Sequence, residues 1–110
     1  MHYNSAMDTT LRALADSTRR HILALVWHEE RSASNIASKF SISRPAVSQH
    51  LKVLLDSDLV SLRRSGTQRF YRANHAEIAK VQDELSSFWD ATLPRLKRAA
   101  EQTERGARRR

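Results

Sequence analysis

Apolar residues recur at helical spacing through the first half of the chain, and this pattern predicts a series of short helices. Helix starts are marked by side chains that can accept hydrogen bonds from the free N–H groups of a first turn. Asp16, Ser32 and Ser43 are expected to cap three helices in this way. A further short helix is expected from Asp8, after a loose start over residues 1–7.

The helix expected over Ser43–Asp56 is strongly amphipathic. Pro45 lies in its first turn, where the missing N–H of proline costs no hydrogen bond. Its apolar side is formed by residues at helical spacing, namely Val47, Leu51, Leu54 and Leu55. Its polar side has no acid before Asp56 and consists of Arg44, Ser48, Gln49 and Lys52. A helix that only faces water usually mixes both signs of charge.

A change of period from 3.6 to 2 after Asp58 predicts a β-hairpin. Two runs with β-like alternation, 59–64 and 68–72, are joined by the short turn 65–67, which contains Gly66.

The last predicted element is a long helix, capped by Asn74 and running over about 76–102. Its apolar stripe exceeds what the thin core of so short a chain can cover, so a second copy of the chain is expected to cover it. Pro94 is expected to kink this helix or to weaken one turn. Residues 103–110 have no apolar anchor and are expected to form a disordered basic tail.

Composition is consistent with one domain. A chain of 110 residues supports a single modest core, and two Gly with two Pro are few for an all-β fold. The predicted fold is mainly α with a small β-hairpin (α+β), in the order α-α-α-α-β-β-α. The domain is expected over residues 8–102, between the flexible start and the tail.

The residue inventory excludes several kinds of protein. There are no cysteines, so disulfides, thiolate metal sites and cysteine catalysis are excluded. No apolar run is long enough to cross a bilayer, and residues 1–30 lack the cationic-then-apolar order of a signal peptide. A soluble cytoplasmic protein with no membrane partner is expected.

Positive charge is concentrated in the middle of the chain. The net charge is +7, and residues 31–72 carry eight Lys or Arg against only Asp56 and Asp58. Such a block suits the closely spaced phosphates of DNA, because its binding releases condensed counterions. A solvated face that only aids solubility would show the same charge, so the order of the elements must decide.

That order fits a winged helix-turn-helix, in which one short helix braces a second that enters the major groove of double-stranded DNA. The recognition helix would be 43–56, where Arg44 and Gln49 have donors suited to guanine and adenine edges. The basic hairpin tip, 63–69, would be a wing on the backbone or minor groove. The residues expected to contact DNA are Ser43, Arg44, Pro45, Ala46, Ser48, Gln49, His50, Lys52, Arg63, Arg64 and Arg69.

Three segments resemble the ArsR (arsenical-resistance repressor) family of winged-helix regulators. They are Leu14–Leu23 (LADSTRRHIL), Ser41–Leu54 (SISRPAVSQHLKVL) and the hairpin residues Gly66 and Arg69–Tyr71, within a resemblance that spans about 11–96. The resemblance implies a homodimer that binds an inverted-repeat operator, usually represses, and releases DNA on a signal. It also implies that the first and last helices pair between subunits. The residues expected at that interface are Leu11, Leu14, Ile78, Val81, Leu85, Phe88, Trp89, Thr92 and Leu96.

The sequence departs from the metal-sensing members of that family. Those members use cysteines on the helix before the recognition helix, or Asp/His and His/Glu pairs on the last helix. Here the first location reads Ser34–Ser38 (SNIAS), and the last helix has no histidine after His75. A zinc site needs three or four well-placed ligands, so no metal and no other cofactor is expected. The sequence resembles instead the metal-independent branch, in which Phe88-Trp89 is a familiar feature.

Two other classes of function compete with this hypothesis. An enzyme could use the carboxylates of Asp83, Glu84 and Asp90, but no partnering base or Gly-rich phosphate loop accompanies them. A winged helix for protein–protein contact would favour acidic or apolar groups on the recognition helix. An RNA-binding one would favour exposed aromatics. Only Phe70 and Tyr71 lie near the basic segment, and one of them must face the core side of the hairpin.

A few residues keep two interpretations. Arg19 and Arg20 could equally reach flanking phosphates or pair with an acidic neighbour. His50 could pack only at the edge of the recognition helix, but contact with a phosphate or base is favoured. His21 and His28 are too few for a metal site and suit the surface or the edge of the core. The aromatic pair on the last helix could line an effector pocket, but dimer core is favoured. The sequence does not identify a small-molecule effector.

Overall fold

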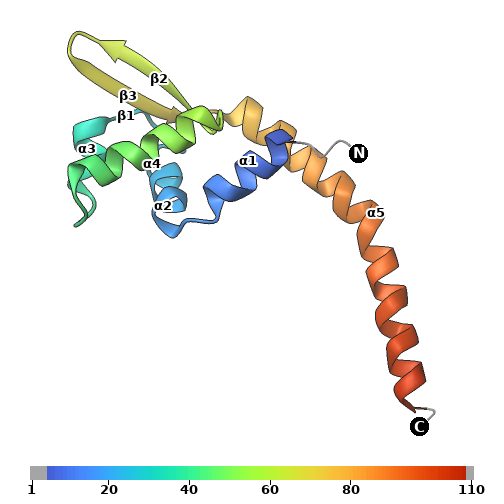
Figure 1. Cartoon of the computed structure of the whole chain (residues 1–110). Helices are drawn as coiled ribbons and strands as arrows, with labels where there is room; N and C mark the ends of the chain where they lie inside the picture. Colours follow the sequence, from blue (N-terminus) through green and yellow to red (C-terminus); the bar gives the residue numbers. More distant parts are fainter. Residues whose placement is uncertain (1–4, 109–110) are drawn as a thin grey trace.

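The computed structural model describes residues 5–108. Figure 1 shows a body of short helices and a small sheet, from which a hairpin projects on one side and a long helix on the other. The chain is accordingly elongated, at 69 × 28 × 27 Å. The elements in chain order are α1 (Ser5–Leu14), α2 (Ser17–Leu25), β1 (Arg31–Ser32), α3 (Ala33–Ser38), α4 (Arg44–Asp56), β2 (Val60–Ser65), β3 (Gln68–Ala73) and α5 (His75–Arg108).

The three predicted helix caps are confirmed. Side-chain oxygens of Asp16, Ser32 and Ser43 accept hydrogen bonds, at 3.1, 3.0 and 3.3 Å, from the backbone N–H three residues later. Each bond satisfies one of the free donors of a first turn. At Asp16 the bond from the backbone N–H of Arg19 holds the pKa of the carboxyl below its ordinary value.

The core lies where α2, α3 and α4 meet the base of the hairpin. Backbone hydrogen bonds connect this base to the helical body, from Ala73 N–H to Val26 O at 3.0 Å and from Asn74 N–H to Leu59 O at 2.9 Å. The core therefore fixes the position of α4 relative to the hairpin. Its largest fully buried side chains are Ile22, Val26, Ile36, Val47, Leu54, Leu59 and Val60.

The sheet has three antiparallel strands in the order β1-β3-β2. The hairpin was predicted, whereas β1 was not, because two residues are too few to show a period of 2. Ser65 lies opposite Gln68 at the tip, so the turn is Gly66–Thr67, one residue shorter than predicted. Gly66 has φ +58°, a left-handed conformation that glycine adopts without steric cost.

The last helix is longer than predicted. Asn74 Oδ1 accepts a hydrogen bond at 3.5 Å from the N–H of Glu77, as expected of its cap, and α5 then continues to Arg108. Residues 103–108 are therefore helical and not the expected disordered tail. Glu104, Arg105 and Ala107 are good helix formers, and the segment extends a helix that is already formed, so it needs no apolar anchor of its own. Similarly, α1 begins at Ser5, earlier than the predicted start; residues 1–4 and 109–110 lie outside the described part of the chain.

Pro94 lies inside α5, and the helix continues on both sides of it. The axis of α5 turns part-way along its length in Figure 1, as proline favours by removing one hydrogen bond of the helix. In the part of the chain that is described, no helix has both the length and the apolar content needed to cross a membrane.

Candidate nucleic-acid interface

The helix α4, predicted to be the recognition helix, buries one side and exposes the other, as its pattern predicted. Val47, Leu51 and Leu54 are buried against the core, whereas Ser48 and Gln49 are exposed. Three apolar contacts along its length fix the rotation of the helix about its axis, so the polar side chains point outward in a defined direction.

A surface groove lies between the start of α3, the start of α4 and the tip of the hairpin. Arg44 and Arg69, both predicted to contact DNA, lie on its two sides. Arg44 Nη2 donates a hydrogen bond at 2.7 Å to Ser34 Oγ, which directs the guanidinium from α4 across to α3. The lining residues are Ser32, Ala33, Ser34, Arg44, Thr67, Gln68 and Arg69. Sequence reasoning missed Ser34, Thr67 and Gln68 as part of this surface, because only the packing of the hairpin against α3 brings them together.

The hairpin separates its arginines onto two faces. Side chains alternate along a strand and cross-strand partners share a face, so Arg64 and its partner Arg69 extend the face that carries the buried residues. Arg63 lies on the opposite face, where it donates two hydrogen bonds to Glu30, at 2.6 and 2.9 Å. Its guanidinium also stacks over the ring of Phe70, 4.6 Å from the centroid.

The predicted role of Arg63 as a DNA contact therefore has no support from this geometry. Its guanidinium holds the pKa of Glu30 below the ordinary value, and the pair joins the hairpin to the segment before β1. The prediction that one of the two hairpin aromatics faces the core is confirmed, because Tyr71 is buried there. We refer to Glu30, Arg63 and Phe70 together as the outer-face cluster.

Lys52 and His50, which were also predicted to contact DNA, each have a partner within the protein. Lys52 Nζ lies 2.9 Å from Asp56 Oδ2, one turn along α4, and both side chains are largely exposed. Such a pair is weak, so Lys52 can exchange its partner for a phosphate. His50 is half-buried, and its Nδ1 lies 3.4 Å from Arg19 Nη1.

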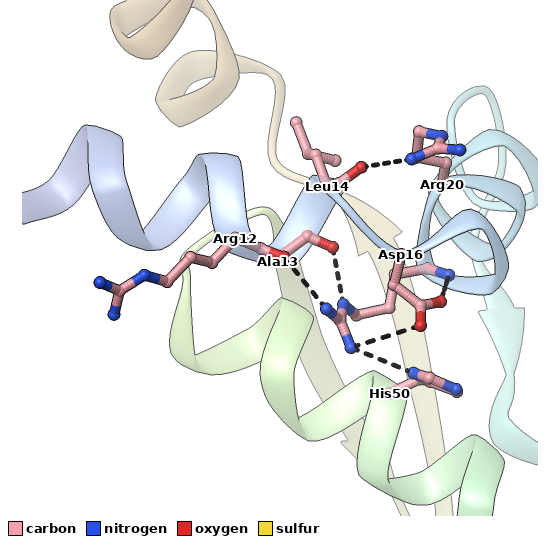
Figure 2. Close-up of polar contacts among 7 residues, drawn as sticks. Arg12, Ala13, Leu14, Asp16, Arg20 and His50 are labelled. Carbon is pink, nitrogen blue, oxygen red and sulfur yellow. Dashed lines mark hydrogen bonds and ion pairs between the residues drawn. The ribbon is translucent and has the colours of Figure 1, made fainter.

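Arg19 and Arg20 bind the C-terminal end of α1, and Figure 2 shows Arg20 directed at the backbone oxygen of Leu14. Arg19 donates to the carbonyl oxygens of Ala13, at 2.6 Å, and Arg12, at 3.0 Å. Arg20 donates to Leu14 O at 2.7 Å. Carbonyl groups at a helix end lack partners within the helix and attract cations. The geometry thus favours a structural role for both arginines over contact with flanking phosphates.

A second exposed surface, of apolar character, follows one side of α5. Phe88, Trp89 and Leu96 are 46%, 41% and 53% exposed, and the two aromatic rings pack edge to face at 5.3 Å. We call this surface the α5 stripe, comprising Val81, Leu85, Phe88, Trp89, Thr92 and Leu96. Of the other residues predicted at the subunit interface, Leu11 on α1 is exposed, whereas Leu14 and Ile78 pack partly against the core of the same chain.

His21 and His75 are engaged in contacts within the chain. His21 packs edge-on to Phe40, with ring centroids 5.0 Å apart, and the Nε2 of His75 lies 2.7 Å from the backbone oxygen of Trp27. Within residues 5–108, no group of three or more His, Cys, Asp or Glu side chains is arranged to hold a metal ion.

Comparison with known proteins identifies the family. Residues 14–63 match the model of a helix-turn-helix domain. The HTH-type transcriptional regulator Rv2034 of Mycobacterium tuberculosis is 41% identical over 86 residues, which cover 78% of this chain and 80% of that protein. The arsenical resistance operon repressor of Staphylococcus aureus is 35% identical over 80 residues, covering 73% and 77%. This chain belongs to the ArsR family of transcriptional regulators.

The fold of this ArsR-family protein also agrees with a solved structure. The homodimeric winged helix-turn-helix DNA-binding domain of a possible ArsR-family regulator from Mycobacterium bovis superposes with a TM-score of 0.64 at 28% identity, covering 78% of this chain and 80% of that one. The predicted winged helix-turn-helix fold and the prediction that the protein is not an enzyme are both confirmed by these relatives.

Proposed function

We propose that this protein is a sequence-specific repressor that binds an inverted-repeat DNA operator as a homodimer. The observation that carries the proposal is the groove between α3, α4 and the hairpin, which Arg44 and Arg69 line from two separate elements. A duplex seated on α4 would then meet cationic donors from both the recognition helix and the wing, as electrostatic binding of phosphates requires.

The start of α4 would read the sequence. Ser43, Pro45 and Ala46 are small or flat, so the helix end can approach the floor of the major groove. Arg44 and Gln49 would then reach base edges, and each good bidentate contact contributes about 1–3 kcal/mol of discrimination. Arg44 can keep its bond to Ser34 while its other guanidinium N–H groups remain available.

The wing and the second turn of α4 would supply affinity without reading sequence. Arg64 and Arg69 share the inner face of the hairpin, the face that carries the buried residues, and their side chains make no hydrogen bond or ion pair with any other residue between 5 and 108. Ser48 and Lys52 are exposed on α4 and suit phosphate oxygens. Arg63 would act indirectly, by holding the hairpin through Glu30.

The α5 stripe would be covered by the same stripe of a second copy. The homodimeric state of the Mycobacterium bovis domain and the exposure of Phe88 and Trp89 both support this arrangement. The long helices, and not α4, would then set the distance between the two recognition helices and so the half-site spacing.

The direction of regulation is proposed from the Staphylococcus aureus relative, which is named as a repressor. For this chain, we propose that the repressor works in the cytoplasm and without a metal; the ligand-poor sequence at Ser34–Ser38 supports the second point. Titration of zinc into chelator-treated protein bound to its operator tests the latter point. No release of DNA is expected, and release at micromolar zinc would contradict metal independence.

The experiment for the DNA-reading assignment is fluorescence anisotropy on a selected operator and a scrambled duplex at fixed salt. The double substitution Arg44→Ala and Gln49→Ala should remove most of the preference for the operator, while the affinity for the scrambled duplex changes little. Unchanged discrimination would show that α4 does not read the sequence. Binding of single-stranded RNA in preference to either duplex would favour the alternative of an RNA-binding winged helix.

A further inference from the structure

Arg19 is held rigidly at the junction of three elements. Its Nε and Nη2 atoms bind the last carbonyl groups of α1, on Ala13 and Arg12, and its side chain is only 18% exposed. Asp16, the cap of α2, has its Oδ2 atom 4.0 Å from Arg19 Nη1. These contacts leave the guanidinium little freedom to move, and the same Nη1 atom points to α4.

On α4, Arg19 Nη1 meets His50 Nδ1 at 3.4 Å (Figure 2). A guanidinium group can only donate hydrogen bonds, so in this contact Nδ1 must be the acceptor and carries no proton. A neutral imidazole then has its single proton on Nε2, on the other side of the ring. The contact therefore selects one tautomer of His50.

The opposite ring nitrogen is available for a partner outside the chain. His50 is half-buried, and no residue in the described range 5–108 makes a hydrogen bond to its Nε2. His50 follows directly after Gln49 on the recognition helix, on the side of α4 nearest the start of α2. A donor at this edge of a recognition helix suits a phosphate oxygen flanking the major groove, because phosphates accept hydrogen bonds and help to fix the docking register.

We propose that Arg19 is a positioning residue for DNA binding, which holds His50 with its proton on Nε2 and directs that N–H to a phosphate of the duplex. This inference rests on the proposed function. It also connects α1 to the recognition helix, because the guanidinium that orients His50 is itself fixed by the end of α1. Arg19 makes no contact with DNA in this arrangement.

The proposal is tested by variants that place an amide N–H at the position of only one of the two ring nitrogens of His50. In His50→Gln the side-chain amide N–H replaces the Nε2 donor, whereas in His50→Asn the shorter amide reaches only the position of Nδ1. Duplex affinity measured by anisotropy should stay within about twofold for His50→Gln and fall about tenfold for His50→Asn. Arg19→Met should also lose about tenfold, and the double variant Arg19→Met with His50→Asn should be no weaker than either single variant.

Arg20→Met is the matched control, because Arg20 also donates to the end of α1 but does not touch His50. A purely structural role of Arg19 would lower affinity equally in the Arg19 and Arg20 variants, or would give losses that multiply in the double variant; either result overturns the proposal. Equal affinity of His50→Asn and the native protein would overturn it as well, and this test does not depend on whether Arg19→Met folds.

The free protein gives a readout that does not involve DNA. In the long-range proton–nitrogen NMR spectrum of histidine-labelled protein, His50 should show the proton on Nε2, and Arg19→Met should shift the ring toward a mixture of tautomers, whereas Arg20→Met should not. A proton on Nδ1 in the native protein overturns the proposal even if DNA binds. Failure of the native protein to bind any duplex, with the expected NMR result, would instead contradict the proposed function.

Discussion

The groove between α3, α4 and the hairpin and the α5 stripe are both exposed, but they favour opposite partners. Arg44, Gln68 and Arg69, which line the groove, can be hydrated at little cost in the absence of a ligand, whereas Phe88 and Trp89 leave large apolar areas in water. A basic surface suits a reversible, salt-sensitive encounter with a polyanion. An apolar stripe suits a stable protein–protein contact. We therefore expect dimerisation to persist at salt concentrations that release DNA.

The largest effect is expected at the α5 stripe. Trp89→Ala removes a large aromatic side chain from the centre of the proposed dimer contact and should weaken self-association by about 2 kcal/mol, or about thirtyfold. Sedimentation should show a shift toward monomer, and affinity for a duplex with two half-sites should fall while that for a single half-site should not.

The matched control for this substitution is Ser87→Ala, on the charged side of the same helix. It should leave sedimentation unchanged. A Trp89→Ala protein that stays dimeric with full affinity would mean that a different surface joins the subunits.

A smaller effect is expected on the hairpin, where two neighbouring arginines should behave differently. Arg64→Ala should weaken binding to all duplexes alike and reduce the slope of log affinity against log salt by about one. Arg63→Ala should leave that slope nearly unchanged, because Arg63 is paired with Glu30 on the outer face. Equal slopes for the two variants would contradict the division of the hairpin into two faces.

The smallest effect is expected in the outer-face cluster and depends on pH. The pKa of Glu30 is lowered in the folded protein from an ordinary value of 4.5, so its pairing with Arg63 contributes stability above that value. The contribution is lost as the pH falls through the lowered pKa. Thermal unfolding should therefore depend less on pH below about 4.5 in Glu30→Gln than in the native protein. An identical pH dependence in both proteins would show that the pair adds nothing to stability, as for many exposed ion pairs.

The sequence predicted those features that are encoded locally. Helix caps such as Asp16 and Ser43 act on the next turn, and the period of 2 in the hairpin is visible without any tertiary contact. The buried side of α4 was predicted because its apolar residues repeat at helical spacing. The helical continuation of α5 through residues 103–108 differs from the prediction of a disordered tail, because a helix that is already formed can propagate through residues such as Glu104, Arg105 and Ala107 without an apolar anchor.

The roles of individual charged side chains could not be predicted in the same way. Arg63 and Arg64 are equivalent by composition, and only the strand register and the position of Glu30 distinguish them. Arg19 and His50 lie far apart in the sequence, and their contact depends on how α2 packs against α4. Such pairings depend on tertiary structure, so they cannot be predicted from the distribution of charge along the chain.

The central claim, that the start of α4 reads double-stranded DNA, is tested most directly by selecting binding sites from a random duplex pool. The native protein should enrich one motif with two inverted half-sites, whereas the protein with Arg44→Ala and Gln49→Ala should enrich none or a degenerate one. Enrichment of the same motif by both proteins, or of no motif by the native protein, would contradict the account.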